Sequence, residues 1–71
     1  MQIILDQLLM AHFDAKLQGG KVHVALPGGK SLVIAEYEGM YMVADAQGDR
    51  TSVPCGSPEE VVDAVKGAAR R

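Results

Sequence analysis

Few residues in this chain have a type and spacing that could support chemistry. Cys55 stands two residues before Ser57, where a helix is expected to begin, and a helix N-terminus can lower the pKa of a nearby thiol. A nucleophilic cysteine also needs a base, and no sequence argument brings His12 or His23 close to Cys55. We therefore expect an ordinary loop or half-buried thiol. A small thiol-dependent enzyme or redox protein that uses Cys55 is the alternative function.

The other polar clusters do not match ligand or cofactor sites. The Gly-Lys-Ser sequence at 29–31 has the ending of a phosphate-binding loop, but Val24 stands where that loop needs glycine. Residues 32–34 also indicate a strand where the loop needs a helix. The histidines and the cysteine lack metal-ligand spacing, and Asp45 and Asp49 lack the further oxygen ligands of a calcium loop. We expect no catalytic residues, no metal and no cofactor.

Length and charge limit the possible partners. The 71 residues predict a single domain, 1–71, and one cysteine cannot form an internal disulfide. A chain this short buries only about 60% of its unfolded surface, so self-association or a bound partner would add stability. The net charge is −2, with positive charges scattered apart from Arg70 and Arg71, which argues against nucleic acid. No apolar run approaches a membrane span and no signal peptide is evident, so we expect a cytoplasmic protein.

Residues 21–54 predict an antiparallel meander of four short strands, because apolar residues alternate with others at a period of two. Tight turns are expected at Pro27-Gly28-Gly29, Glu38-Gly39 and Ala46-Gln47-Gly48, and Pro54-Cys55-Gly56 should end the meander. These loop lengths fix the register. The expected cross-strand pairs are Val24–Leu32, Val22–Ile34, Ile34–Val43, Glu36–Tyr41, Val43–Thr51 and Tyr41–Val53.

Helices are expected on both sides of the meander. Leu5, Leu8, Leu9, Phe13 and Leu17 have helical spacing, which predicts a helix over 2–18 that ends at Gly19-Gly20. An edge strand at the first few residues is the alternative. The second helix is expected over 58–69. Its start carries Ser57 as N-cap, Pro58 at the first helical position and Glu60 to complete a capping box.

The second sheet face is the candidate binding surface. The register places Val33, Tyr37, Met40 and Met42 opposite the core, on a face with few charges. Methionine suits adaptable binding surfaces, and exposed apolar patches often mark interaction sites. The expected partner is a protein target or a second copy of the chain. In the alternative arrangement the first helix covers this face and the molecule is a three-layer monomer.

The expected fold is therefore α+β, with the order helix, four strands, helix. This order is similar to the double-stranded RNA-binding domain, which has one strand fewer, but the chain lacks the basic helix start of such domains. In size, acidity and lack of catalytic residues it resembles the small phage-encoded inhibitors of bacterial immunity, such as anti-CRISPR proteins. The resemblance covers the whole chain through these general features, without a motif. It implies a small non-enzymatic protein, an inhibitor or adaptor, that blocks a large host complex.

Overall fold

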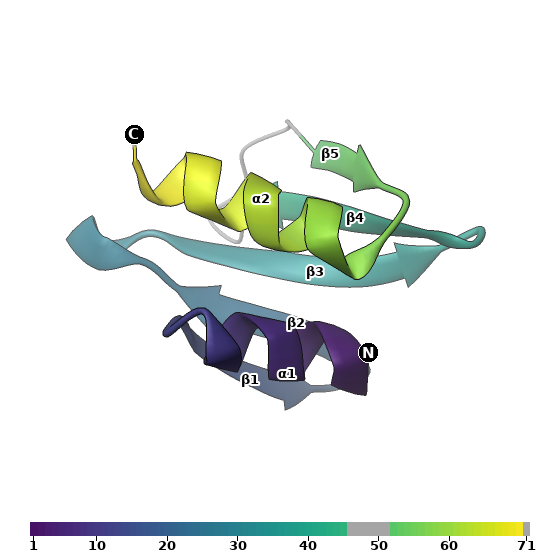
Figure 1. Ribbon diagram of the computed structural model, residues 1–71, viewed down its shortest axis with the longest axis horizontal. Helices are drawn as coiled ribbons and strands as arrows, with labels where there is room; N and C mark the ends of the chain where they lie inside the picture. The colour runs from purple at the N-terminus through teal and green to yellow at the C-terminus, as the bar shows by residue number, and fades with distance from the viewer. Residues whose placement is uncertain (46–51, 71) are drawn as a thin grey trace.

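Two helices lie on one face of a five-stranded antiparallel sheet (Figure 1). The computed structural model describes residues 1–45 and 52–70. The strands follow one another in sequence order across the sheet. The elements are α1 (Gln2–Met10), β1 (Asp14–Gln18), β2 (Lys21–Ala25), the short 3-10 turn η1 (Pro27–Gly29), β3 (Ser31–Tyr37), β4 (Met40–Asp45), β5 (Ser52–Cys55) and α2 (Pro58–Ala69). The fold is α+β, as expected, but it has five strands rather than four.

The additional strand is β1, whose residues were predicted to belong to the first helix, over 2–18. Helix α1 ends at Met10 because His12 adopts the left-handed conformation, with a φ of 68°. The His12 N–H donates to the Leu9 carbonyl at 3.0 Å, and the Phe13 N–H donates to the Leu8 carbonyl at 3.0 Å. These two bonds are those of a Schellman helix end, which usually carries glycine at the left-handed position. The prediction of a helix over 2–18 is therefore wrong in its extent, and the alternative of an edge strand at the first few residues is wrong because α1 begins at Gln2.

The Gly-Gly pair that was expected to end the first helix instead turns β1 back onto β2. Gly19 and Gly20 have φ values of 62° and 78°, as a two-residue type I′ hairpin turn requires. Gln18 and Lys21 are paired across this turn. The turn makes β1 an edge strand in a sheet that was expected to begin at β2.

The predicted register of β2, β3 and β4 is confirmed. The structure pairs Val22 with Ile34, Val24 with Leu32, Ile34 with Val43, and Glu36 with Tyr41. The Leu26 N–H donates to the Lys30 carbonyl at 2.8 Å, which leaves residues 27–29 as the loop. Glu38 and Gly39 form the two-residue β3–β4 turn with φ values of 51° and 78°. Turn chemistry and apolar alternation thus specify the same strand pairing.

The predicted register of the last strand is wrong by two residues. Val43 lies opposite Val53 rather than Thr51, and Tyr41 lies opposite Cys55 rather than Val53. Thr51 and the predicted Ala46–Gly48 turn lie outside the described residues. An even shift keeps each side chain on its expected face, but it makes residues 54–55 part of β5 instead of a break. Proline is tolerated there because the strand lies at the sheet edge.

Both helices pack on the same side of the sheet, so the molecule has two layers rather than three. α1 lies against β1 and α2 lies against β4 and β5, and the helices also contact each other. A single core lies between helices and sheet; it contains Ile4, Leu8, Val22, Val24, Leu26, Leu32, Ile34, Val43, Cys55, Val61, Val62 and Val65. Because α1 covers the face of Val22 and Val24, it does not cover the face of Met42.

The second helix begins and ends as predicted. The Ser57 hydroxyl accepts a hydrogen bond from the Glu60 N–H at 3.3 Å. The Glu60 carboxylate accepts from the Gly56 N–H at 2.8 Å, one residue before the amide that a standard capping box would use. Pro58 occupies the start of the helix, where a missing N–H costs nothing.

Candidate interaction surface

The sheet surface opposite the helices is called the open face. Directly paired residues of neighbouring strands point to the same side, and successive residues of one strand alternate between sides. The pairings therefore assign to the open face Asp14, Lys16, Gln18, Lys21, His23, Ala25, Ser31, Val33, Ala35, Tyr37, Met40, Met42, Ala44 and Pro54. This face divides into two halves along the strand order.

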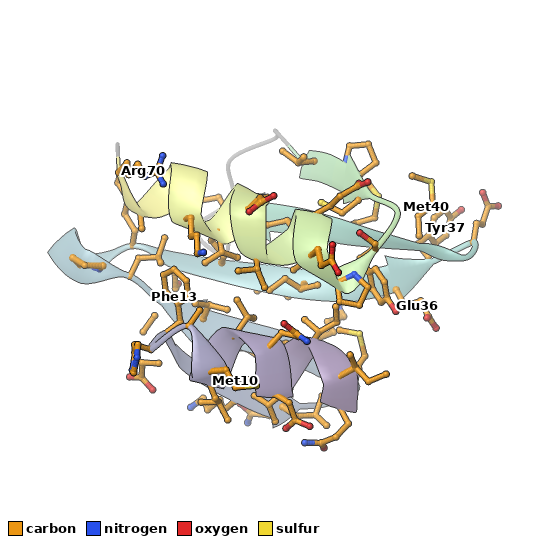
Figure 2. The ribbon with its side chains drawn as sticks, in the orientation of Figure 1. Met10, Phe13, Glu36, Tyr37, Met40 and Arg70 are labelled. Atoms are coloured by element: carbon orange, nitrogen blue, oxygen red, sulfur yellow. The ribbon has the colours of Figure 1, made fainter. Side chains whose placement is uncertain are left out.

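The half over β3, β4 and β5 is apolar. Its described side chains are Val33, Ala35, Tyr37, Met40, Met42, Ala44 and Pro54, after Ser31 at the start of β3. Tyr37 is 65% exposed and Met40 is 41% exposed. They are paired beside the β3–β4 turn, where Figure 2 shows them close together. The four predicted contact residues, Val33, Tyr37, Met40 and Met42, all belong to this half.

The half over β1 and β2 is polar, and sequence reasoning missed most of it. The predicted helix over 2–18 included Asp14, Lys16 and Gln18, although they alternate with Ala15 and Leu17 before the Gly-Gly turn. Asp14 and Lys16, together with residues of β2 and Ser31, surround a hollow of about 310 Å³; its lining residues are Asp14, Lys16, His23, Val24, Ala25 and Ser31. The period-two alternation followed by Gly-Gly was the signal that could have located this half.

Exposed apolar side chains on α1 form a less continuous surface. Ile3 is 63% exposed, Leu9 48% and Met10 75%. At about 100° per residue, Ile3 and Met10 share one flank of the helix, whereas Leu9 lies on the other. The exposed residues of α1 are therefore split, whereas the apolar half of the open face spans three adjacent strands.

Cys55 lies in the core rather than in a loop. Its side chain is 2% exposed, and its Sγ lies 3.8 Å from the Val53 carbonyl oxygen. Burial, and to a lesser extent the nearby Glu60 carboxylate, raises the pKa of the Cys55 thiol. The thiolate is the reactive form, so both effects make this cysteine a poorer nucleophile at neutral pH.

Two kinds of site are absent from the described ranges, 1–45 and 52–70. Within them no group of three or more His, Cys, Asp or Glu side chains could hold a metal ion. No helix in the same ranges is long and apolar enough to cross a membrane.

The chain was compared with known proteins through families, sequences and structures. No protein family, curated protein or solved structure matches it.

Proposed function

We propose that this protein is a non-enzymatic protein-interaction module that binds through the apolar half of its open face. The observation that supports the proposal is the continuous apolar surface over β3, β4 and β5, on the side that neither helix covers. An antiparallel sheet with one packed face normally carries polar side chains on the other. Exposed apolar patches often mark contact surfaces, and Met40 and Met42 suit such a surface because methionine adapts to irregular partners.

The proposed partner is a larger protein rather than a second copy. The described apolar residues are three on β3, three on β4 and Pro54 on β5. Three strands spaced by about 4.8 Å, over a strand length of four or five residues, give a patch of roughly 14 by 15 Å. A stable interface buries about 800 Å² on each partner, which is more than this patch provides by itself. A second copy adds the same small patch, whereas a larger protein can extend over the polar half and the β3–β4 turn. By binding this larger protein, the chain would act as an inhibitor or adaptor, like the phage-encoded inhibitors that it resembles in size and acidity.

The test compares two methionine-to-glutamate variants. Met42→Glu places a charge within the apolar half, where burial by a partner would be strongly unfavourable. Met10→Glu is the matched control, because Met10 is 75% exposed on α1 and belongs to no part of the open face (Figure 2). The wild-type chain is used to isolate a partner from its native host. The affinity of each variant for that partner is then measured by calorimetry, with circular dichroism to verify folding.

We expect Met42→Glu to remain folded and to lose about tenfold or more in affinity, and Met10→Glu to bind like the wild type. Equal affinities for the two variants would contradict the proposal. The other possible occupant of the apolar half is a second copy of the chain. Sedimentation at increasing protein concentration would detect such a dimer, and dissociation of the dimer by Met42→Glu would identify the second copy as the partner.

A further inference from the structure

We propose that the outer edge of β1 pairs with β1 of a second copy of the chain, so that two copies form one continuous antiparallel sheet. This inference goes beyond the proposed function, because it concerns the edge of the sheet rather than the open face. Three features of the edge support it: the direction of its backbone groups, the order of its charges and the apolar side chains of α1 beside it.

The two edges of the sheet differ in how readily they accept another strand. β5 is four residues long and contains Pro54, which has no N–H to donate. Proline on an edge strand is one of the means by which proteins prevent pairing with another chain. β1 is five residues long and contains neither proline nor glycine. The β1 edge is therefore the better template for an added strand.

Ala15 and Leu17 direct their backbone groups out of the sheet. The two residues that flank a two-residue hairpin turn, here Gln18 and Lys21, form a hydrogen-bonded pair. Hydrogen-bonded and non-hydrogen-bonded pairs alternate along the ladder, so the N–H and C=O groups of Ala15 and Leu17 point away from β2. Within residues 1–45 and 52–70, neither residue forms a backbone hydrogen bond outside its strand. These groups are available to another strand.

The charges of β1 are self-complementary in one register. The outward groups belong to odd-numbered residues, so an antiparallel self-pair is centred on a residue. Centring on Asp14 or Lys16 places like charges directly opposite each other, which is destabilising. Centring on Leu17 or Gln18 brings no charged residues together. Centring on Ala15 places Asp14 opposite Lys16 of the second copy, and the two-fold symmetry repeats this ion pair.

The register centred on Ala15 also satisfies the outward backbone groups. The Ala15 N–H of each copy donates to the Ala15 carbonyl of the other. The Leu17 N–H of each copy donates to the Phe13 carbonyl of the other. The Phe13 N–H already donates to the Leu8 carbonyl at 3.0 Å, so self-pairing leaves the end of α1 intact.

Apolar side chains of α1 flank the same edge. In Figure 1, α1 runs from right to left in front of β1 and β2, with α2 above it. In a right-handed helix seen this way, the residue after one that faces the sheet points away from α2, toward the outer edge of β1. Leu8 is buried against the sheet, so Leu9, which is 48% exposed, points toward this edge. Leu5 lies one turn before Leu9 on the same flank.

Leu17 extends this apolar flank onto the strand. It is paired with the buried Val22, so its side chain lies on the helix side of β1, where it is 42% exposed. In the two-fold pair, Leu17 falls opposite Phe13 of the second copy, and the Leu5–Leu9 flanks of the two helices face each other. Self-pairing therefore covers apolar surface that a single copy leaves in water.

The pair leaves the proposed partner surface uncovered. Asp14 and Lys16 both lie on the open face, so the open faces of the two copies share one side of the combined sheet. The apolar halves then lie toward its outer ends. Seven strand spacings separate the two β4 strands, which is about 34 Å along the sheet. A dimer of this kind presents two separate binding surfaces to partners.

The experiment measures self-association of the wild-type chain and locates the contact. Sedimentation equilibrium between about 20 µM and 1 mM should give a dimer with a dissociation constant of tens to hundreds of micromolar, as expected of a small interface. Dilution of the isotope-labelled chain, followed by NMR, should shift the backbone amides of residues 13–17 and of Leu5 and Leu9. The amides of β4 should keep their positions.

Charge-reversal variants test the register. Lys16→Glu and Asp14→Lys each replace both attractive pairs by repulsive ones, so each should raise the dissociation constant about tenfold or more. A mixture of these two variants restores both attractive pairs and should form a heterodimer about as stable as the wild-type dimer. Lys66→Glu makes the same charge change on α2, which packs on β4 and β5, and should self-associate like the wild type.

The outcomes are distinct from those that test the proposed function. Met42→Glu should leave this dimer unchanged, and a dimer that Met42→Glu dissociates would overturn the β1 assignment. A chain that stays monomeric at 1 mM refutes self-pairing, even if an isolated partner protects the amides of Ala15 and Leu17, because the added strand would then belong to that partner. Equal weakening by Lys16→Glu and Lys66→Glu, or no heterodimer in the mixture, refutes the register centred on Ala15.

Discussion

Ile34 and Val43 lie directly opposite each other on β3 and β4, and both are buried beneath the helices. Ile34 is 0% exposed and Val43 is 5% exposed. The pair occupies the middle of the sheet, with two strands on either side of β3. Both residues belong to the single core that also contains Ile4 and Leu8 of α1 and Val61, Val62 and Val65 of α2.

Replacing Ile34 with alanine should therefore lower the free energy of unfolding by about 2–5 kcal/mol, a large share of the stability of a small domain. Urea unfolding followed by circular dichroism measures the loss. Val33→Ala is the control, since Val33 directly precedes Ile34 in β3 but lies half-buried on the open face. If both variants lost the same amount, the assignment of the two sheet faces would be wrong.

Removing the cap of α2 should cost less. Ser57→Ala leaves the Glu60 N–H without its hydroxyl acceptor and should lower stability by about 1 kcal/mol. Ser57→Thr retains a hydroxyl and should lose only a fraction of that. The melting temperatures of the two variants provide the comparison, and an unchanged transition for Ser57→Ala would contradict the helix start at Pro58.

Replacing His12, the left-handed residue that ends α1, with glycine should stabilise the folded protein. His12 has a φ of 68°, a conformation that costs an L-residue about 1–2 kcal/mol relative to glycine. His12→Gly removes this cost at the expense of greater freedom in the unfolded chain, for a net gain of roughly 0.5–1 kcal/mol. His12→Ala should show no gain, because alanine keeps the steric conflict. A loss of stability in His12→Gly would argue that the helix continues past Met10.

The Cys55 thiol should react slowly in the folded protein and rapidly in denaturant. Burial and the Glu60 carboxylate raise its pKa, so the folded state favours the protonated thiol. The stability associated with this preference is present below the ordinary thiol pKa of about 8.5 and is lost as the pH rises through the raised value. Labelling with a disulfide reagent at pH 8, with and without denaturant, measures the difference. Fast labelling of the folded chain would revive the thiol-dependent alternative.

Predictions from the sequence were reliable where turn or capping residues specify the local structure. Pro27 followed by two glycines, and Glu38-Gly39, specified the loops that set the pairing of Ile34 with Val43. Ser57, Pro58 and Glu60 specified the start of α2 through contacts within four residues. In each case the deciding interaction is local, so the sequence contains all the partners.

The misplaced elements are those whose local pattern fits two structures. Phe13 and Leu17 extend the helical spacing of Leu5 and Leu9, yet Ala15 and Leu17 also fit the alternation of a strand. The stop at His12 was hidden because histidine, rather than glycine, occupies the left-handed position. Pairing along β2 decided between the alternatives, since it satisfies the backbone of residues 14–18 in the sheet.

In the candidate site, too, some features follow from the local sequence pattern and others only from tertiary packing. The sequence alone determined that Val33, Tyr37, Met40 and Met42 share one sheet face, because strand periodicity fixes the side to which each residue points. Only the tertiary structure decided that both helices occupy the opposite face, that Cys55 is buried in the core, and that β1 adds the polar half with Asp14 and Lys16. Those features depend on which apolar surfaces pack together across long stretches of chain, and no local pattern specifies that choice.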